Sequence, residues 1–93
     1  MSYKLSFHPD ALVEWRKLDA TVSGQFKKKL AERLQHPRVA SSQLSGHKDR
    51  YKIKLRSVGY RLVYEVRDAV LLVVVVAVGK RERNAVYRVA AKR

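Results

Sequence analysis

Residues 70–78 read Val-Leu-Leu-Val-Val-Val-Val-Ala-Val, and this uninterrupted apolar run sets the plan of the fold. Nine residues are about half of a membrane-spanning helix. A strand of this composition is apolar on both faces. We therefore expect residues 70–78 to form a central strand of a sheet that is covered on both sides, or nearly so.

Two amphipathic strands are predicted before this run, over residues 51–56 and 60–67. Their apolar side chains must share one face of the sheet, because a slip of one residue would carry lysines into the core. This condition requires an even-numbered loop, with Lys54 opposite Arg61 and Lys52 opposite Val63. Asp68-Ala69 leaves room only for a tight hairpin before the apolar strand.

The first 37 residues predict one strand and a helical hairpin. Residues 3–7 alternate as a short strand does, and His8-Pro9-Asp10 begins a helix. Thr21 or Ser23 can cap a second helix, which ends at His36-Pro37. The apolar stripes of the two helices are Ala11, Leu12, Trp15 and Leu18, then Val22, Phe26, Leu30 and Leu34.

A polar loop follows at 38–50, and residues 83–91 predict a short last helix. The order is β-α-α-β-β-β-α, which indicates an α+β domain with helices packed on a mainly antiparallel four-stranded sheet. The 93 residues are expected to form a single domain, with one sheet face partly open.

The charge of the chain predicts an acidic partner. Lys and Arg total 21 against 8 Asp and Glu, a net charge of +13. Residues 1–46 contribute 8 − 4 = +4 and residues 47–93 contribute 13 − 4 = +9, so we expect the binding surface in the second half. RNA is the obvious polyanion, although a generally basic, soluble surface is the simpler alternative.

Several classes of function are disfavoured. The chain has no cysteine, so it has neither disulfides nor thiolate metal sites, and its eight acids show no metal-ligand spacing. We expect no cofactor and no metal. The first residues lack an apolar signal core, and no run is long enough for a membrane span, so a cytoplasmic location is expected.

A set of four cations and one phenol stands out in the second half: Lys52, Lys54, Arg61, Arg81 and Tyr87. Lys54 and Arg61 would point the same way from adjacent strands, an arrangement that costs stability unless an anion binds. The alternative is a solvated strand face that blocks edge aggregation. Arg81 follows the apolar strand, where functional groups are common. For Tyr87, composition alone favours the alternative, an aromatic that packs the last helix onto the sheet.

A second basic cluster lies on the second predicted helix, at Lys27, Lys28, Lys29 and Arg33. These side chains could contact RNA backbone or simply form a solvated helix face. Trp15, Phe26, Tyr60 and Tyr64 lie on apolar stripes or buried strand faces, so we assign them to the core.

Four segments together resemble the RelE toxins of bacterial toxin–antitoxin pairs. They are Ala11–Leu18 (ALVEWRKL), Tyr51–Ser57 (YKIKLRS), Gly59–Tyr64 (GYRLVY) and Val78–Arg83 (VGKRER), followed by Tyr87. The similarity extends along essentially the whole chain. It implies a microbial-RNase-like fold and a type II toxin that enters the ribosomal A site and cuts the mRNA displayed there.

The resemblance also implies which residues act. The catalytic and RNA-contacting positions carry over as Lys52, Lys54, Arg61, Arg81 and Tyr87. Lys80 and Arg83 flank Arg81 and are added as RNA- or rRNA-binding candidates, with the cluster on the second helix. The implied partners are the ribosome, an acidic RelB-like antitoxin and, through the antitoxin complex only, operator DNA.

The side chains of this set suggest a metal-free reaction in which the RNA 2′-hydroxyl attacks and a 2′,3′-cyclic phosphate forms. Tyr87 is the first candidate for the base, provided that neighbouring cations lower its pKa, and Lys54 is the rival. Arg61 and Arg81 are expected to grip the phosphate, while the family analogy also makes Arg81 a general acid. A gyrase poison of the ParE type and a non-catalytic RNA-binding module are the alternatives.

Overall fold

The apolar run forms strand β4 (Leu72–Lys80), an interior strand of a four-stranded sheet. A computed structural model describes residues 2–93 of the chain. In the strand order β1-β4-β3-β2, β4 pairs in parallel with β1 and antiparallel with β3. Residues 73–78 are all buried, which confirms the expected central strand. The sheet is mixed, and the predicted α+β class is confirmed.

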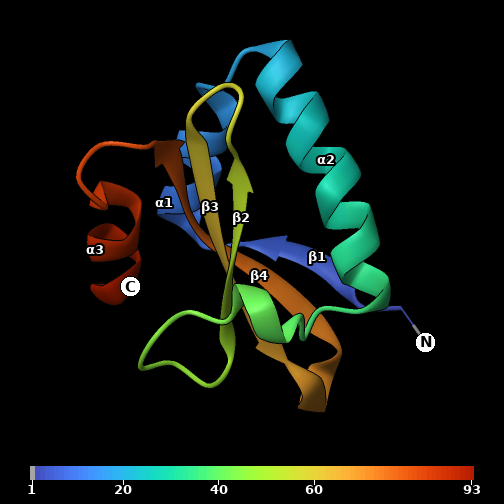
Figure 1. Cartoon of the computed structure of the whole chain (residues 1–93). Helices are drawn as coiled ribbons and strands as arrows, with labels where there is room; N and C mark the ends of the chain where they lie inside the picture. Colours follow the sequence, from blue (N-terminus) through green and yellow to red (C-terminus); the bar gives the residue numbers. More distant parts are fainter. Residues whose placement is uncertain (1) are drawn as a thin grey trace.

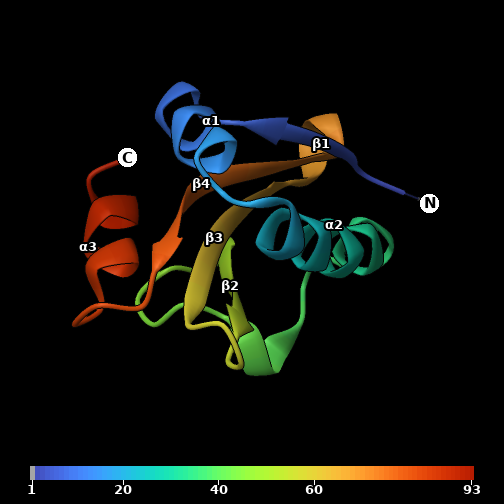
Figure 2. The ribbon, with the colours of Figure 1, turned by 90° about the horizontal axis from the view of Figure 1, so that it is seen from above.

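The helices lie on both sides of this twisted sheet (Figures 1 and 2). Helices α1 and α2 share a core with one face, and α3 packs on the other face. The remaining elements are β1 (Lys4–Phe7), α1 (Pro9–Arg16), α2 (Ala20–Gln35), the short 3₁₀ helix η1 (Ala40–Ser42), β2 (Arg50–Leu55), β3 (Tyr60–Arg67), the 3₁₀ helix η2 (Asp68–Val70) and α3 (Ala85–Ala91).

The larger core contains the predicted helical stripes except Leu12, which is only partly buried and lies outside that core. Phe26 and Leu30 of α2 are fully enclosed against Ile53, Leu62 and other apolar side chains of the sheet. The smaller core lies beneath α3. Its buried members are Val63, Val76, Ala77, Val86 and Ala90.

The register of the β2–β3 hairpin is the predicted one. Lys54 pairs with Arg61, and Lys52 pairs with Val63. The cations therefore lie on the face away from α1 and α2, beside α3. This is the face that was expected to be partly open.

A β-bulge at Val76 changes the alternation of β4 and was not predicted. Val63 pairs with Ala77, whereas the next residue, Tyr64, pairs with Val75, so Val76 is an extra residue on β4. Val76 and Ala77 consequently both join the core beneath α3. Beyond the bulge, the alternation of β4 side chains between the two sheet faces is shifted by one residue. Gly79 therefore lies opposite Arg61.

Three local predictions were wrong. Helix α2 is capped by Asp19, whose Oδ1 accepts a hydrogen bond from the Val22 amide at 2.9 Å, and not by Thr21 or Ser23. An extended backbone and a carboxylate at the positive end of the helix dipole favour Asp19 as the cap.

The connection between β3 and β4 is longer than the predicted tight turn at Asp68-Ala69. It consists of η2 followed by Leu71 in a left-handed conformation. The last strand therefore covers residues 72–80 and not the predicted 70–78.

The last helix begins later than expected. Arg83 and Asn84 have positive φ angles of 47° and 61°, which do not continue into a right-handed helix. Helix α3 therefore starts at Ala85, whose amide donates to the Glu82 carbonyl at 2.8 Å.

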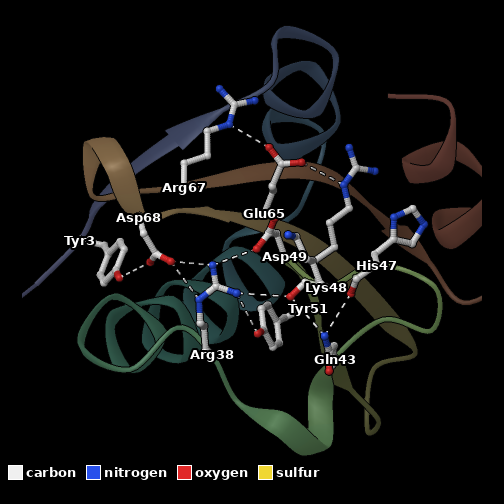
Figure 3. A network of polar contacts seen from close by, with 11 residues as sticks. Tyr3, Arg38, Gln43, His47, Lys48, Asp49, Tyr51, Glu65, Arg67 and Asp68 are labelled. Atoms are coloured by element: carbon white, nitrogen blue, oxygen red, sulfur yellow. Dashed lines mark hydrogen bonds and ion pairs between the residues drawn. The ribbon is translucent and has the colours of Figure 1, made fainter.

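A polar network anchors the loop at 38–49 (Figure 3). Arg38 donates to Asp68 at 2.7 Å, to Asp49 at 2.9 Å and to the Tyr51 hydroxyl at 3.3 Å. Tyr3 donates to the same Asp68 at 2.5 Å. These contacts tie the loop to β2, to η2 and to the segment that leads into β1.

Candidate functional site

Two adjoining cavities lie where the end of β4, the β2–β3 hairpin and α3 meet. The first is a small recess of about 90 Å³, and the second is a wider hollow of about 520 Å³. Lys54 and Tyr87 line both. Arg61 and Arg81 line the first, and Lys52 lines the second. The structure thus brings together the five residues proposed from the sequence, although their roles stay a prediction.

Arg61 is a nearly buried cation at the bottom of the recess. It is 8% exposed, and one guanidinium nitrogen donates to the Tyr60 carbonyl at 2.9 Å. Among residues 2–93, no carboxylate pairs with it within 4.0 Å. The facing Gly79 leaves this side of β4 without a side chain. A buried cation without an acidic partner favours binding of an anion.

Tyr87 projects from α3 toward the strand cations. The centre of its ring lies 5.9 Å from the Lys52 ammonium nitrogen. Its hydroxyl is buried and makes no hydrogen bond of ordinary geometry with the described residues. Burial raises the pKa of Tyr87, and the nearby positive charge of Arg61 offsets this only in part. The expected net lowering of this pKa is therefore wrong: Arg61 acts in the predicted direction, but desolvation of the phenolate is the larger effect.

The pKa of Lys54 moves in the opposite direction. The charge of Lys52 is the main cause, followed by desolvation and by the charges of Arg56 and Arg61, and together they lower the pKa of the Lys54 amine. Cations on one strand face disfavour the addition of a further proton. The two candidate bases thus separate, with a phenol held neutral and an amine that loses its proton more easily.

The last residue of β4 and the segment that follows it carry the other predicted cations. Lys80 and Arg81 line the recess, and the Arg81 amide donates to the Gly59 carbonyl at 2.6 Å. This bond fixes the start of the segment to the hairpin turn. Arg83 is exposed and lines neither cavity. Asn84 also lines both cavities and adopts the left-handed conformation, and no motif in the sequence predicted it as a site residue.

The basic cluster of α2 divides into two parts. Lys27, Lys28 and Lys29 are exposed and line neither cavity. Arg33 is half-buried and donates to the Tyr64 hydroxyl at 2.9 Å and to the Lys52 carbonyl at 3.3 Å. Its guanidinium carbon also lies 5.7 Å from the centre of the Tyr64 ring. These contacts fix the Arg33 side chain at the edge of β2, and its contact with RNA stays a prediction.

Two guanidinium groups hold α3 in place. Arg93 forms a bidentate pair with Glu14 of α1, at 2.8 and 2.9 Å, and also donates to the Val76 carbonyl at 2.9 Å. Arg50 of β2 donates to the Ala90 carbonyl at 2.6 Å. These contacts position the helix that carries Tyr87. They join residues far apart in the chain, so no local sequence signal indicates them.

Two further properties bear on the class of site. In residues 2–93, no three His, Asp or Glu side chains gather closely enough to hold a metal ion. Across the same part of the chain, no helix is long and apolar enough to cross a membrane.

Comparison with known proteins defines the class first. Residues 5–85 match the family described as the ParE toxin of the type II toxin–antitoxin system parDE, to which the chain belongs. Within it, the chain is 57% identical over 93 residues to the mRNA interferase toxin RelE of Escherichia coli K12, covering 100% of this chain and 98% of that protein. A putative RelE-like toxin of E. coli is 53% identical over the same length.

Solved structures agree with this assignment. A double arginine mutant of E. coli RelE in the free state superimposes with a TM-score of 0.92 at 55% identity, covering 100% of this chain and 98% of that one. The RelE chain of the intact E. coli RelBE toxin–antitoxin complex gives a TM-score of 0.84 at 56% identity, covering 88% and 100%. The resemblance to RelE-type endoribonucleases is thereby confirmed.

Proposed function

We propose that this chain is the toxin of a type II toxin–antitoxin system and that it cleaves mRNA in the ribosomal A site. The 57% sequence identity to a RelE mRNA interferase, over the whole length of this chain, supports the nuclease activity. The observation that carries the proposal is the convergence of Lys52, Lys54, Arg61, Arg81 and Tyr87 on two adjoining cavities. Four cations around one phenol suit a phosphodiester whose negative charge increases during the reaction.

In the proposed reaction the RNA 2′-oxygen forms a bond to phosphorus while the bond from phosphorus to the 5′-oxygen breaks. Arg61 and Arg81 bind the non-bridging oxygens and stabilise the pentacoordinate phosphorane. Lys54, in its neutral form, accepts the proton of the 2′-hydroxyl. The leaving 5′-oxygen takes a proton from the phenol of Tyr87, and the product is a 2′,3′-cyclic phosphate.

The assignment of Lys54 as the base uses its lowered pKa, and the assignment of Tyr87 as the acid uses its place in the same recess and its protonated phenol. A base near neutral pH needs a lowered amine pKa, and a hydrogen donor needs to stay protonated. Lys54 and Tyr87 change in these two directions. Arg81 acts by its charge, because a guanidinium is a poor proton donor.

Dependence on the ribosome follows from the weakness of these groups. A lysine amine is mostly protonated at neutral pH, so proton transfer contributes less than with histidine. Holding the message in an in-line geometry can supply on the order of 7–11 kcal/mol in favourable cases. We propose that the ribosome provides this alignment, and that Lys27, Lys28, Lys29, Lys80 and Arg83 contact RNA backbone.

An acidic antitoxin of the RelB type is the proposed protein partner. The net charge of +13 supports a partner of opposite charge, and a related RelE chain was solved in a complex with its antitoxin RelB. Operator DNA would be bound only through that complex. The cytoplasm, which contains the translating ribosomes, is the proposed compartment.

Primer extension on a message translated in a cell extract tests the cleavage. Codon-positioned stops that require the purified chain are expected, and they should disappear with Tyr87→Phe although that variant still sediments with ribosomes. Arrested replication without cuts would instead indicate a gyrase poison. Ribosome binding and translation arrest without cuts, unaffected by the substitution, would indicate a pure RNA-binding module.

A further inference from the structure

A third hollow lies along the free edge of β2, outside the two cavities of the proposed nuclease site. It has a volume of about 380 Å³ and is lined by Arg33, Ser41, Ser42, Lys52, Lys54 and Arg56. All six residues are cationic or carry a hydroxyl. Arg56, Ser41 and Ser42 are not among the residues that the sequence indicated. We call this hollow the edge groove.

The edge groove is continuous in its lining with the cleavage cavities. Lys54 lines the recess and the groove, and Lys52 lines the wider cavity and the groove. Residues 52, 54 and 56 alternate along β2 and the turn after it, so a row of three cations extends over about 13 Å. A chain of phosphates that crosses Lys54 would meet further positive charge on the groove side.

Arg33 is preorganised at the groove. Its guanidinium donates to the Tyr64 hydroxyl, to the Lys52 carbonyl and to the Ser42 hydroxyl, the last at 3.3 Å. A guanidinium has five N–H donors, so these three bonds leave two for a ligand. Because the Arg33 side chain is already fixed, little side-chain conformational entropy is lost when an anion binds there.

The loop that carries the two serines is also held in place. Arg38 ties it to Asp49 and Asp68, and Gln43 donates across the loop to the Lys48 carbonyl at 3.1 Å (Figure 3). The helix η1, which contains Ser41 and Ser42, is thereby held beside β2 (Figure 1). Contacts within the chain are sufficient to form the groove.

We propose that the edge groove binds one phosphodiester of the substrate RNA strand next to the scissile one. This proposal rests on the proposed nuclease function and identifies a second contact of the same substrate. Arg33 and Arg56 bind the phosphate, with the hydroxyls of Ser41 and Ser42 as neutral donors. The groove thereby sets the position of the strand, and the scissile phosphate falls over Arg61.

Single-turnover cleavage on programmed ribosomes tests the groove. Arg56→Gln should raise the half-saturating toxin concentration about fivefold to tenfold, as expected for loss of one charge-assisted contact, and leave the saturating rate nearly unchanged. Lys17→Gln removes the same charge from the exposed residue that follows α1 and should change neither value. Ser41→Asp adds a negative charge to the groove and should weaken binding at least as strongly.

Messages with one neutral methylphosphonate identify the phosphate. At one position beside the cut, the neutral linkage should weaken cleavage by wild type at least as much as Arg56→Gln does. Its effect should be smaller in the Arg56→Gln variant than in wild type, because the Arg56 part of the contact is already lost there. Equal behaviour of Arg56→Gln and Lys17→Gln, or additive effects at every position, would overturn the proposal.

Failure of the nuclease assignment remains distinguishable. If wild type cuts no message, binding of a fluorescent 2′-deoxy strand, measured by anisotropy, still tests the groove. Weaker binding by Arg56→Gln than by Lys17→Gln supports the groove, and equal binding by the two variants overturns it.

Discussion

The ammonium nitrogen of Lys52 lies 5.9 Å from the centre of the Tyr87 ring, across the space between the edge strand β2 and helix α3. The two residues are separated by 35 positions in the chain, yet both line the wider cavity. The contact places a phenol over a row of strand cations. The proposed chemistry depends on this juxtaposition.

Tyr87→Phe separates chemistry from folding. The Tyr87 hydroxyl is buried, Arg61 is close to it, and it makes no hydrogen bond of ordinary geometry with the described residues, so its removal should change the free energy of unfolding by no more than about 1 kcal/mol. Cleavage should fall by about 10²–10⁴-fold if the phenol transfers a proton. Urea unfolding and single-turnover cleavage measure the two effects. A variant that unfolds more easily and still cleaves would contradict this role.

The pH dependence of cleavage should follow Lys54. The charge of Lys52 is the main cause of the lowered Lys54 pKa, so the rate should rise with pH as the amine loses its proton. In Lys52→Gln this rise should move to higher pH, because the repulsion is gone. Tyr87→Phe should lower the rate and leave the rising part in place. If the cleavage rate of Lys54→Ala still rose with pH in the same way, a group other than Lys54 would be the base.

The Glu14–Arg93 pair should control how well α3 is positioned. Both side chains are largely buried, at 28% and 15% exposed, and Glu14 also accepts from the Val78 amide at 3.2 Å. We expect Glu14→Gln to cost about 1–3 kcal/mol of stability and to speed hydrogen exchange of the α3 amides. Cleavage at saturation should fall about tenfold, because 1 Å of misplacement is costly. Glu32→Gln, on the exposed side of α2, is the matched control.

Acid should loosen the loop network through Asp68. Hydrogen bonds from Tyr3 and Arg38 hold the pKa of this carboxyl below its ordinary value of 3.8. Its contribution to stability is therefore present above that value and is lost as pH falls through the lower, folded-state pKa. Between pH 5 and pH 2, about the range of carboxyl titration, the melting temperature of wild type should fall more steeply than that of Asp68→Asn. Parallel curves would show that Asp68 does not contribute.

The exposed lysines of α2 should affect binding alone. Changing Lys27, Lys28 and Lys29 together to Gln should weaken ribosome binding and reduce its dependence on salt concentration. The saturating rate should be unchanged, because these side chains line neither cavity. A fall in that rate would place them closer to the chemistry than the fold does.

Alternation of side chains was sufficient to predict the hairpin register, because the pairing of Lys54 with Arg61 follows from a two-residue period and one buried face. The bulge at Val76 has no such signal. Every residue from 73 to 78 is apolar, so the sequence cannot show where the alternation shifts. Packing of α3 against Val76 and Ala77 accompanies that shift.

The sequence was sufficient to predict which side chains of the proposed nuclease site cluster together. It was not sufficient to predict the burial and charge around each of them. Lys52, Lys54 and Arg61 share a face by local geometry. The desolvation that raises the Tyr87 pKa comes from α3 lying against the sheet, in an orientation held by Glu14, Arg50 and Arg93. Such contacts between distant segments have no local pattern. The same holds for the edge groove, which the folded 38–49 loop completes.

The most direct test replaces the 2′-hydroxyl at the scissile nucleotide of a ribosome-bound message by hydrogen. The proposed site activates this hydroxyl, so wild type should cut the unmodified message to a 2′,3′-cyclic phosphate and leave the 2′-deoxy message intact while binding both equally. Cleavage of the 2′-deoxy message at a comparable rate would contradict the account, because water would then be the nucleophile.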